Sequence, residues 1–191
     1  MEMNAVLKTK RLVLRSFHPN DVDAVYEFNK TAQWSPYLRI ASEGYTRKNA
    51  EDFISRAILQ DSRAFSQFAI TMGRKVVGSI GLKMEPQHGT GELKFSIGAP
   101  HSARGIATEA ANSVLEYGFN GLGLYKIHAR ADARSTGVIT MFGKIGMVQE
   151  GLLKGQMLLG DERIDEVLFG ALRADWVERS NASTEELIVN K

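Results

Sequence analysis

The residues that could do chemistry in this chain gather where a predicted strand passes through a loop into a predicted helix. The stretch GAPHSARGIATEAANSVLEYGF covers residues 98–119. A helix start leaves several backbone N–H groups without partners and carries the positive end of the helix dipole, so it favours anions. Gly105 lets a ligand approach the backbone closely, and Arg104 adds a positive charge. Residues 103–108 are therefore predicted to bind a phosphate or pyrophosphate. A strand–helix turn with a glycine for steric reasons would show the same pattern.

Other catalytic signatures are missing from the sequence. It contains no G-x-x-x-x-G-K-[ST] phosphate loop, no G-x-S-x-G serine elbow and no H-E-x-x-H zinc motif. The histidines are scattered, without the spacing of metal ligands. The absence of cysteine excludes disulfides, thiolate metal sites and a cysteine nucleophile. We therefore expect no metal site.

The composition narrows the class of protein. The chain has 191 residues, of which 43% are hydrophobic and 24% charged, as in an ordinary globular domain. The formal net charge is +2, and no run of like charge suggests a nucleic-acid surface. No apolar run approaches the roughly 18 residues of a membrane span. We expect a cytoplasmic protein that binds neither nucleic acid nor membrane, as a monomer or homodimer.

The elements that must position the loop can be read from periodicity. Alternating apolar and polar residues predict strands at 7–15, 92–98 and 125–132, and hairpins that turn at 73–75 and 160–161. Helical spacing predicts helices at 106–119 and 136–145. It also predicts two earlier helices. The first begins at HPND and has an apolar face of Val22, Val25, Tyr26 and Phe28; the second is capped by Thr46 and has an apolar face of Phe53, Ile54, Ala57 and Ile58.

The irregular mixture of strands and helices favours an α+β domain over a doubly wound sheet. We predict one domain at residues 7–178, followed by a polar C-terminal tail, 179–191. Within that tail, Ser183 and Glu186 could form a helix capping box.

Four motifs, in this order, resemble the GNAT superfamily of N-acetyltransferases, in its RimJ/RimL-like branch of ribosomal-protein-alanine N-acetyltransferases. They are TKRLVLR at 9–15, RGIATEA at 104–110, YGFNGLGLYKIHARAD at 117–132 and GKIGM at 143–147. The resemblance spans about residues 7–177. It implies a mixed, mostly antiparallel sheet of about seven strands flanked by about four helices, with two central strands splayed apart.

The resemblance also implies acetyl-CoA as cosubstrate. The loop would hold the pyrophosphate of CoA, and the pantetheine arm would pair with the backbone of the first splayed strand. An extended amide chain on an open strand edge is also reasonable on physical grounds, because both sides supply N–H and C=O groups. The residues implied to bind CoA are Phe95, Ser96, Ile97, Ala103, Arg104, Gly105, Ile106, Ala107, Thr108 and Phe142.

The implied reaction is direct transfer of the acetyl group to a primary amine of a protein N-terminus or small molecule, within a ternary complex. A backbone N–H around Ile97 would stabilise the tetrahedral oxyanion. Glu92 is the candidate base, acting through water, although a solvated glutamate at a strand start is a competing interpretation. Asp165 could orient the acceptor or brace the last hairpin, and we favour bracing.

The sequence departs from the family where the departing thiolate should be protonated. Relatives carry an asparagine, then a serine three residues later, or a tyrosine further on. Here these positions are Ser135, Val138 and Phe142. Ser135 is therefore the candidate catalytic hydroxyl, with a water or Thr136 as alternatives. Val138 and Phe142 support an alternative hypothesis, an acyl-CoA-binding or regulatory module with weak or no turnover, but Glu92 and the intact loop favour the acetyltransferase.

Overall fold

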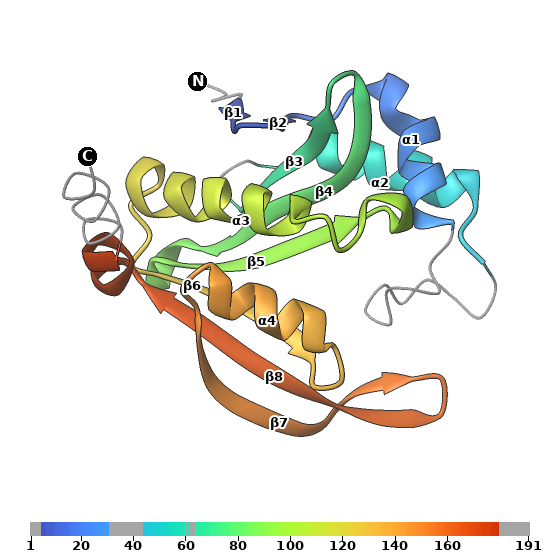
Figure 1. Cartoon of the computed structure of the whole chain (residues 1–191). Coiled ribbons are helices and arrows are strands. Elements are labelled where there is room, and N and C mark those ends of the chain that lie inside the picture. The colour runs from blue at the N-terminus through green and yellow to red at the C-terminus, as the bar shows by residue number, and fades with distance from the viewer. Residues whose placement is uncertain (1–4, 31–43, 60, 62–63, 180–191) are drawn as a thin grey trace.

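The computed structural model describes residues 5–30, 44–59, 61 and 64–179. They form one mixed sheet with helices on both faces (Figure 1). The strands are β1 Leu7–Lys8, β2 Val13–Arg15, β3 Phe65–Met72, β4 Lys75–Glu85, β5 Thr90–Ile97, β6 Lys126–Asp132, β7 Val148–Leu159 and β8 Glu162–Leu172. The main helices are α1 Val22–Asn29, α2 Arg47–Leu59, α3 Ile106–Glu116 and α4 Thr136–Lys144, and residues 173–179 are also helical.

The strand order within the described residues is β1-β2-β3-β4-β5-β6-β8-β7, so the sheet has eight strands. All neighbours are antiparallel except β5 and β6. Those two parallel strands pair only at Thr90↔Lys126, Gly91↔Ile127 and Glu92↔His128. Beyond Glu92 they separate, which confirms the expected α+β fold with two splayed central strands.

The expectation of one strand over residues 7–15 is wrong, and this accounts for the eighth strand. β1 and β2 pair with each other, Leu7 with Leu14 and Lys8 with Val13. Thr9 closes the turn between them: its N–H donates to the Leu12 carbonyl at 3.0 Å, and its hydroxyl accepts the Leu12 N–H at 3.0 Å. A threonine side chain that bonds nearby backbone in this way favours a turn over continued extension.

α3 and α4 cover one face of the sheet, and α1 and α2 cover the other (Figure 1). Ile106, Ala110 and Val114 of α3 belong to the main core, together with Leu82 and Leu93 of the sheet. A smaller core holds residues of the first two helices against Ala69: Val25, Phe28, Ala50 and Ile54. No helix among the described residues is long and apolar enough to span a membrane.

The helix boundaries follow local signals in most places. Thr46 caps α2, because its hydroxyl accepts the Asn49 N–H at 3.2 Å while the Asn49 side chain accepts the Thr46 N–H at 2.8 Å. Ile58, expected on the buried face, is 45% exposed, so only the rest of that stripe packs inward. The predicted helix 106–119 continues past α3 as a wider π-helical turn, Tyr117–Gly121.

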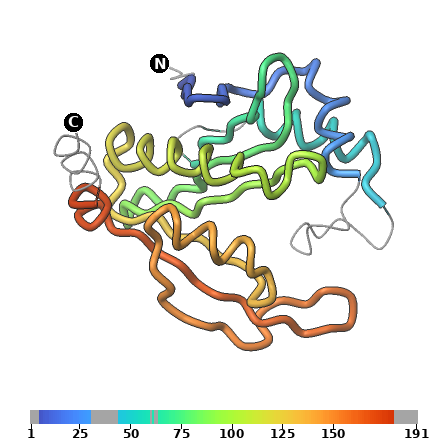
Figure 2. Tube along the Cα trace, viewed as in Figure 1, coloured from blue at the N-terminus to red at the C-terminus, as the bar shows by residue number. Residues whose placement is uncertain are grey.

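α3 and α4 lie side by side and run in the same direction (Figures 1 and 2). Each follows one of the splayed strands, α3 after β5 and α4 after β6. Both helix N-termini therefore lie at the end where β5 and β6 have separated. The starts of α3 and α4 therefore lie close to the edge of β5 that β6 leaves unpaired. The predicted hairpin turns at 73–75 and 160–161 also form, between β3 and β4 and between β7 and β8.

Candidate active site

A cavity of about 960 Å³ occupies the gap between the splayed strands. Its walls come from β5, β6, the loop before α3, the starts of α3 and α4, and the β7–β8 hairpin. Most of the site residues expected from the sequence line it: Glu92, Phe95, Ser96, Ile97, Ala103, Gly105, Ile106, Ala107, Thr108 and Ser135.

The loop before α3 is shaped for an anion. Ala103 and Gly105 both have left-handed backbone conformations, with φ of 56° and 73°. For Ala103 this costs about 1–2 kcal/mol, a strain that persists where surrounding structure holds it. Gly105 is the N-cap of α3, and the Glu109 N–H donates to its carbonyl at 3.0 Å. The N–H groups of residues 106–108 precede that first helical bond and are free to bind a ligand.

The cavity reaches both faces of the sheet. Side chains alternate along β5, so Leu93, Phe95 and Ile97 point towards α3 and α4. Glu92 and Lys94 then point to the opposite face, yet they line the same cavity. This is possible because β6 does not pair with β5 beyond Glu92, which leaves an opening through the sheet.

The opposite face carries charged side chains around that opening. The Lys94 Nζ lies 3.1 Å from the Glu92 carboxylate, whose side chain is 20% exposed. Arg130 of β6 lies 3.9 Å from Glu166 of β8, which is buried. No motif in the sequence pointed to Lys94, Arg130 or Glu166. Strand alternation could have found the first two, because each lies two residues beyond the last β5–β6 pair on the same face.

His128 faces Glu92 across the last pair of the parallel strands. Partial burial lowers the pKa of the His128 imidazole, although the nearby Glu92 charge acts in the opposite direction. Among the described residues, no group of acidic and histidine side chains could hold a metal ion.

Two buried polar atoms in residues that line the cavity lack a hydrogen-bond partner among the described residues. They are the Ser96 hydroxyl oxygen and the His101 Nδ1. A buried polar group without a partner costs free energy, so such atoms mark places where a ligand can supply the missing bond. With the anion-binding loop and the open edge of β5, they suit an elongated ligand that has both amide and phosphate groups.

Ser135 is the N-cap of α4 and lies at the cavity wall. Its N–H donates to the Asp132 carbonyl at 2.8 Å, and its own carbonyl accepts the N–H groups of Val138 and Ile139 at 3.0 Å. The Asp132 carboxylate is buried and accepts the backbone N–H of Arg134 at 2.8 Å and its Nη2 at 2.8 Å. These contacts hold the turn that presents Ser135.

Two expected CoA contacts lie outside the cavity lining. Phe142 is 1% exposed and packs edge-on against Phe95, with ring centroids 6.3 Å apart, so it supports the wall from behind. The Arg104 carbonyl accepts a bond from Arg11 Nη1 at 3.1 Å, on the outer side of the loop. Asp165 accepts the Gly155 N–H at 2.7 Å, a bond that braces the β7–β8 hairpin.

Comparisons with known proteins agree with this architecture. The family model described as the acetyltransferase (GNAT) domain matches residues 11–148. The uncharacterized N-acetyltransferase YnaD of Bacillus subtilis (strain 168) is 28% identical over 171 residues, which cover 89% of this chain and 98% of that protein.

Two solved structures share the fold. The crystal structure of an acetyltransferase (GNAT family) from Bacillus anthracis has 26% sequence identity and a TM-score of 0.76, covering 89% of this chain and 99% of that one. Spermidine N-acetyltransferase from Vibrio cholerae, in complex with CoA and spermine, has 20% identity and a TM-score of 0.76, covering 88% and 99%. The chain therefore belongs to the GNAT family of acetyltransferases.

Proposed function

We propose that this protein transfers the acetyl group of acetyl-CoA directly to a primary amine while both substrates are bound. The observation that carries this proposal is a cavity open to both faces of the sheet, with the anion-binding loop on the side of α3 and Glu92 on the other. Donor and acceptor can then meet in the gap between the splayed strands without competing for one entrance. That geometry favours direct transfer over a covalent enzyme intermediate.

On the donor side, the N–H groups of residues 103–108 bind the pyrophosphate. The pantetheine arm lies along residues 93–97, where the backbone of β5 has lost its β6 partner. Phe142 stabilises this wall through Phe95 instead of contacting the cofactor itself.

On the acceptor side, the amine must lose a proton before it attacks. Glu92 takes that proton through a water, and the Lys94 ammonium lies 3.1 Å from the Glu92 carboxylate. The amine nitrogen then forms a bond to the thioester carbon. A backbone N–H around Ile97 donates to the resulting oxyanion. When the C–S bond breaks, the nitrogen loses its extra proton and the CoA thiolate gains one. Ser135, or a water that it holds, relays the proton and ends neutral, so the products are the N-acetylated amine and CoA.

The charges around the acceptor opening favour a peptide N-terminus over a polyamine. Spermine carries several positive charges, and a site for it needs carboxylates that are not already paired. Among the described residues that line this cavity, the carboxylates are Glu92 and Glu166, and each lies beside a cation. A peptide N-terminus has a single ammonium followed by neutral backbone, which such a site can accept. This agrees with the RimJ/RimL-like motifs in the sequence.

A thiol-release assay tests the proposal. The chain contains no cysteine, so the thiol freed from acetyl-CoA is the only one a thiol reagent will detect. We expect release that depends on an amine, with peptides that begin in alanine or serine preferred to spermidine, and mass spectrometry should find one acetyl group on the peptide amine. CoA binding without turnover on any amine would instead support the acyl-CoA-binding module. Absence of CoA binding would contradict both hypotheses.

A further inference from the structure

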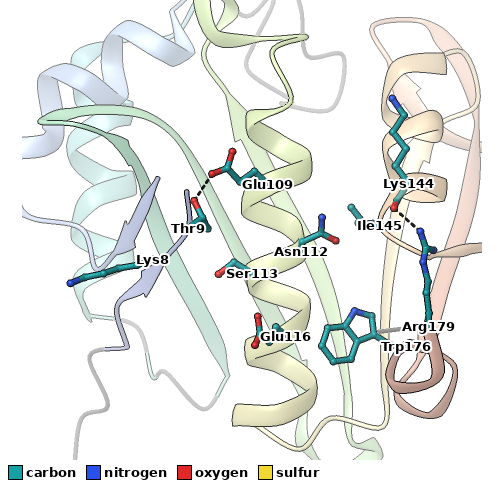
Figure 3. Close-up of a pocket in the computed structure, with 10 residues that line it drawn as sticks. All are labelled: Lys8, Thr9, Glu109, Asn112, Ser113, Glu116, Lys144, Ile145, Trp176 and Arg179. Atoms are coloured by element: carbon teal, nitrogen blue, oxygen red, sulfur yellow. Dashed lines mark hydrogen bonds between the residues drawn. The ribbon is translucent and has the colours of Figure 1, made fainter. Parts of the chain in front are cut away.

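The outer side of α3 holds a network that reaches the anion-binding loop from behind. Glu109, in the first turns of α3, accepts three hydrogen bonds from the turn between β1 and β2. The donors are the Thr9 hydroxyl at 2.6 Å, the Arg11 backbone N–H at 2.8 Å and the Arg11 Nε at 2.6 Å. Figure 3 shows Glu109 and Thr9 pointing towards each other at the edge of a second, outward-facing pocket of about 610 Å³.

Arg11 extends this network to the loop itself. Its Nη1 donates to the Arg104 carbonyl at 3.1 Å, while its Nε remains on Glu109. One guanidinium thus spans two bonds in a plane, which a lysine ammonium cannot reproduce. Glu109 is 18% exposed; burial acts to raise its pKa, but the bonds from Thr9 and Arg11 outweigh this and lower it, so the carboxylate stays ionised.

The Arg104 carbonyl decides where one of the anion-binding N–H groups points. In a trans peptide the C=O of one residue and the N–H of the next point in opposite directions. Because Arg11 holds the Arg104 carbonyl on the outer side, the Gly105 N–H of the same peptide points inward, where Gly105 lines the cavity. Arg104 stands between two residues with left-handed backbone, Ala103 and Gly105, so a bond from outside the loop would hold the Arg104–Gly105 peptide in one orientation.

We propose that Arg11 and Glu109 are positioning residues, which hold the Arg104–Gly105 peptide in the orientation that binds the diphosphate of acetyl-CoA. This inference rests on the proposed function, because it takes the loop to bind the CoA phosphates. It assigns a role to the turn between β1 and β2, which touches neither the thioester nor the acceptor amine. The turn acts on the affinity for the donor and not on the chemical step.

The experiment compares Arg11→Ala with the parent protein on two donors, acetyl-CoA and S-acetylpantetheine, which lacks the diphosphate. With acetyl-CoA, KM should rise about tenfold and kcat should change less than about twofold, because the diphosphate loses one aligned backbone N–H and the reacting groups are untouched. With S-acetylpantetheine, kcat/KM should not change. A general loss of structure would instead lower kcat/KM for both donors, and that result would overturn the inference.

Lys10→Ala is the matched control, because Lys10 is the exposed neighbour of Arg11 in the same turn. It should leave both donors unaffected. Glu109→Gln is the second variant, should Arg11→Ala fold poorly. It keeps the side-chain shape and weakens the hold on Arg11, so it should raise KM for acetyl-CoA alone. Arg11→Lys should not restore the affinity.

A third donor separates positioning from direct contact. If Arg11 touched the 3′-phosphate, Arg11→Ala would affect acetyl-CoA but not acetyl-dephospho-CoA, and the inference would be wrong. Positioning predicts the same loss for both, because both keep the diphosphate. An unaltered protein that does not bind CoA would refute the proposed function itself. Normal CoA binding by Arg11→Ala would refute only this inference.

Discussion

Glu92 of β5 lies opposite His128 of β6 in the last pair that the two parallel strands make before they separate. Both side chains lie on the face of the sheet away from α3 and α4, and Glu92 lines the cavity that opens there. The candidate base therefore lies at the vertex of the splayed strands, where an acceptor amine can approach a thioester that arrives from the other face.

Replacing Glu92 by glutamine should separate turnover from binding. The change keeps the shape of the side chain and removes its proton acceptor, so kcat should fall about 10²-fold near neutral pH with little change in CoA affinity. The loss should shrink as pH rises, because more of the acceptor amine is then already neutral. The check is a pH–rate profile, with Glu85→Gln, at the exposed end of β4, as control. An unchanged rate at neutral pH would mean that Glu92 is a solvated side chain at the start of a strand and not the base.

A negative charge in the first turn of α3 should remove CoA binding and leave the fold intact. Ala107 lines the cavity in that turn. Ala107→Glu places a carboxylate where the pyrophosphate is expected, yet acidic residues near a helix N-terminus are not destabilising. Calorimetry should show CoA affinity reduced at least about tenfold, with the melting temperature preserved. Ala107→Gln, similar in size and neutral, should bind CoA more tightly than Ala107→Glu. Equal affinity of the two variants would argue against an anion at this position.

The missing family hydroxyl suggests a variant that gains activity. Val138 lies at the cavity wall, one helical turn beyond Ser135. The CoA thiol has a pKa of about 8.5, so its thiolate leaves without a nearby acid, but slowly. Val138→Ser should raise kcat with CoA affinity nearly unchanged, because the hydroxyl acts on charge that develops in the transition state. Steady-state kinetics of this variant and of Ser135→Ala give the comparison. If only Ser135→Ala has an effect, Ser135 supplies the proton; if neither does, proton delivery to the thiolate is not limiting.

Stability should depend on pH through Asp132. Hydrogen bonds from Arg134 lower the pKa of this buried carboxyl below its ordinary 3.8. A group whose pKa is lower in the folded state stabilises the fold fully above its unfolded value and loses that contribution as pH falls through the folded value. Asp132→Asn should therefore lower the free energy of unfolding at pH 7, and the gap to the parent should narrow below about pH 4. Urea titrations at pH 7 and pH 3 measure the difference in the free energy of unfolding between the two proteins. Differences of equal size at the two pH values would contradict the role given to Asp132.

Acceptor preference should respond to the charge of Arg130. Arg130→Gln removes the cation beside Glu166 and leaves that buried carboxylate available to a substrate ammonium. The ratio of kcat/KM for spermidine to that for an alanine peptide should rise in this variant. Arg173→Gln, an exposed arginine beyond the end of β8, serves as control. A ratio that does not move would mean that the Arg130–Glu166 pair does not face the acceptor.

Local signals in the sequence were enough for the loop and for most elements. Gly105 and the small residues around it predict a helix start that can approach a ligand, and the structure has a left-handed Gly105 at that N-cap. Thr46 predicts its own helix cap, and alternation predicts β5 and β6. Such features depend on residues within a few positions of one another, so periodicity and capping rules detect them.

The tertiary structure decided what no local pattern contains. Thr9 bonds to Leu12 and turns the expected first strand back on itself, and Arg11 then reaches Arg104, which lies 93 residues further along the chain. Phe142, which we expected to contact CoA, is buried behind Phe95. Lys94, Arg130 and Glu166 line one cavity because β5 and β6 stop pairing after Glu92. Long-range packing decides which strands pair, where they separate and how deeply a side chain is buried. The charges at the acceptor opening are therefore visible only in the folded structure.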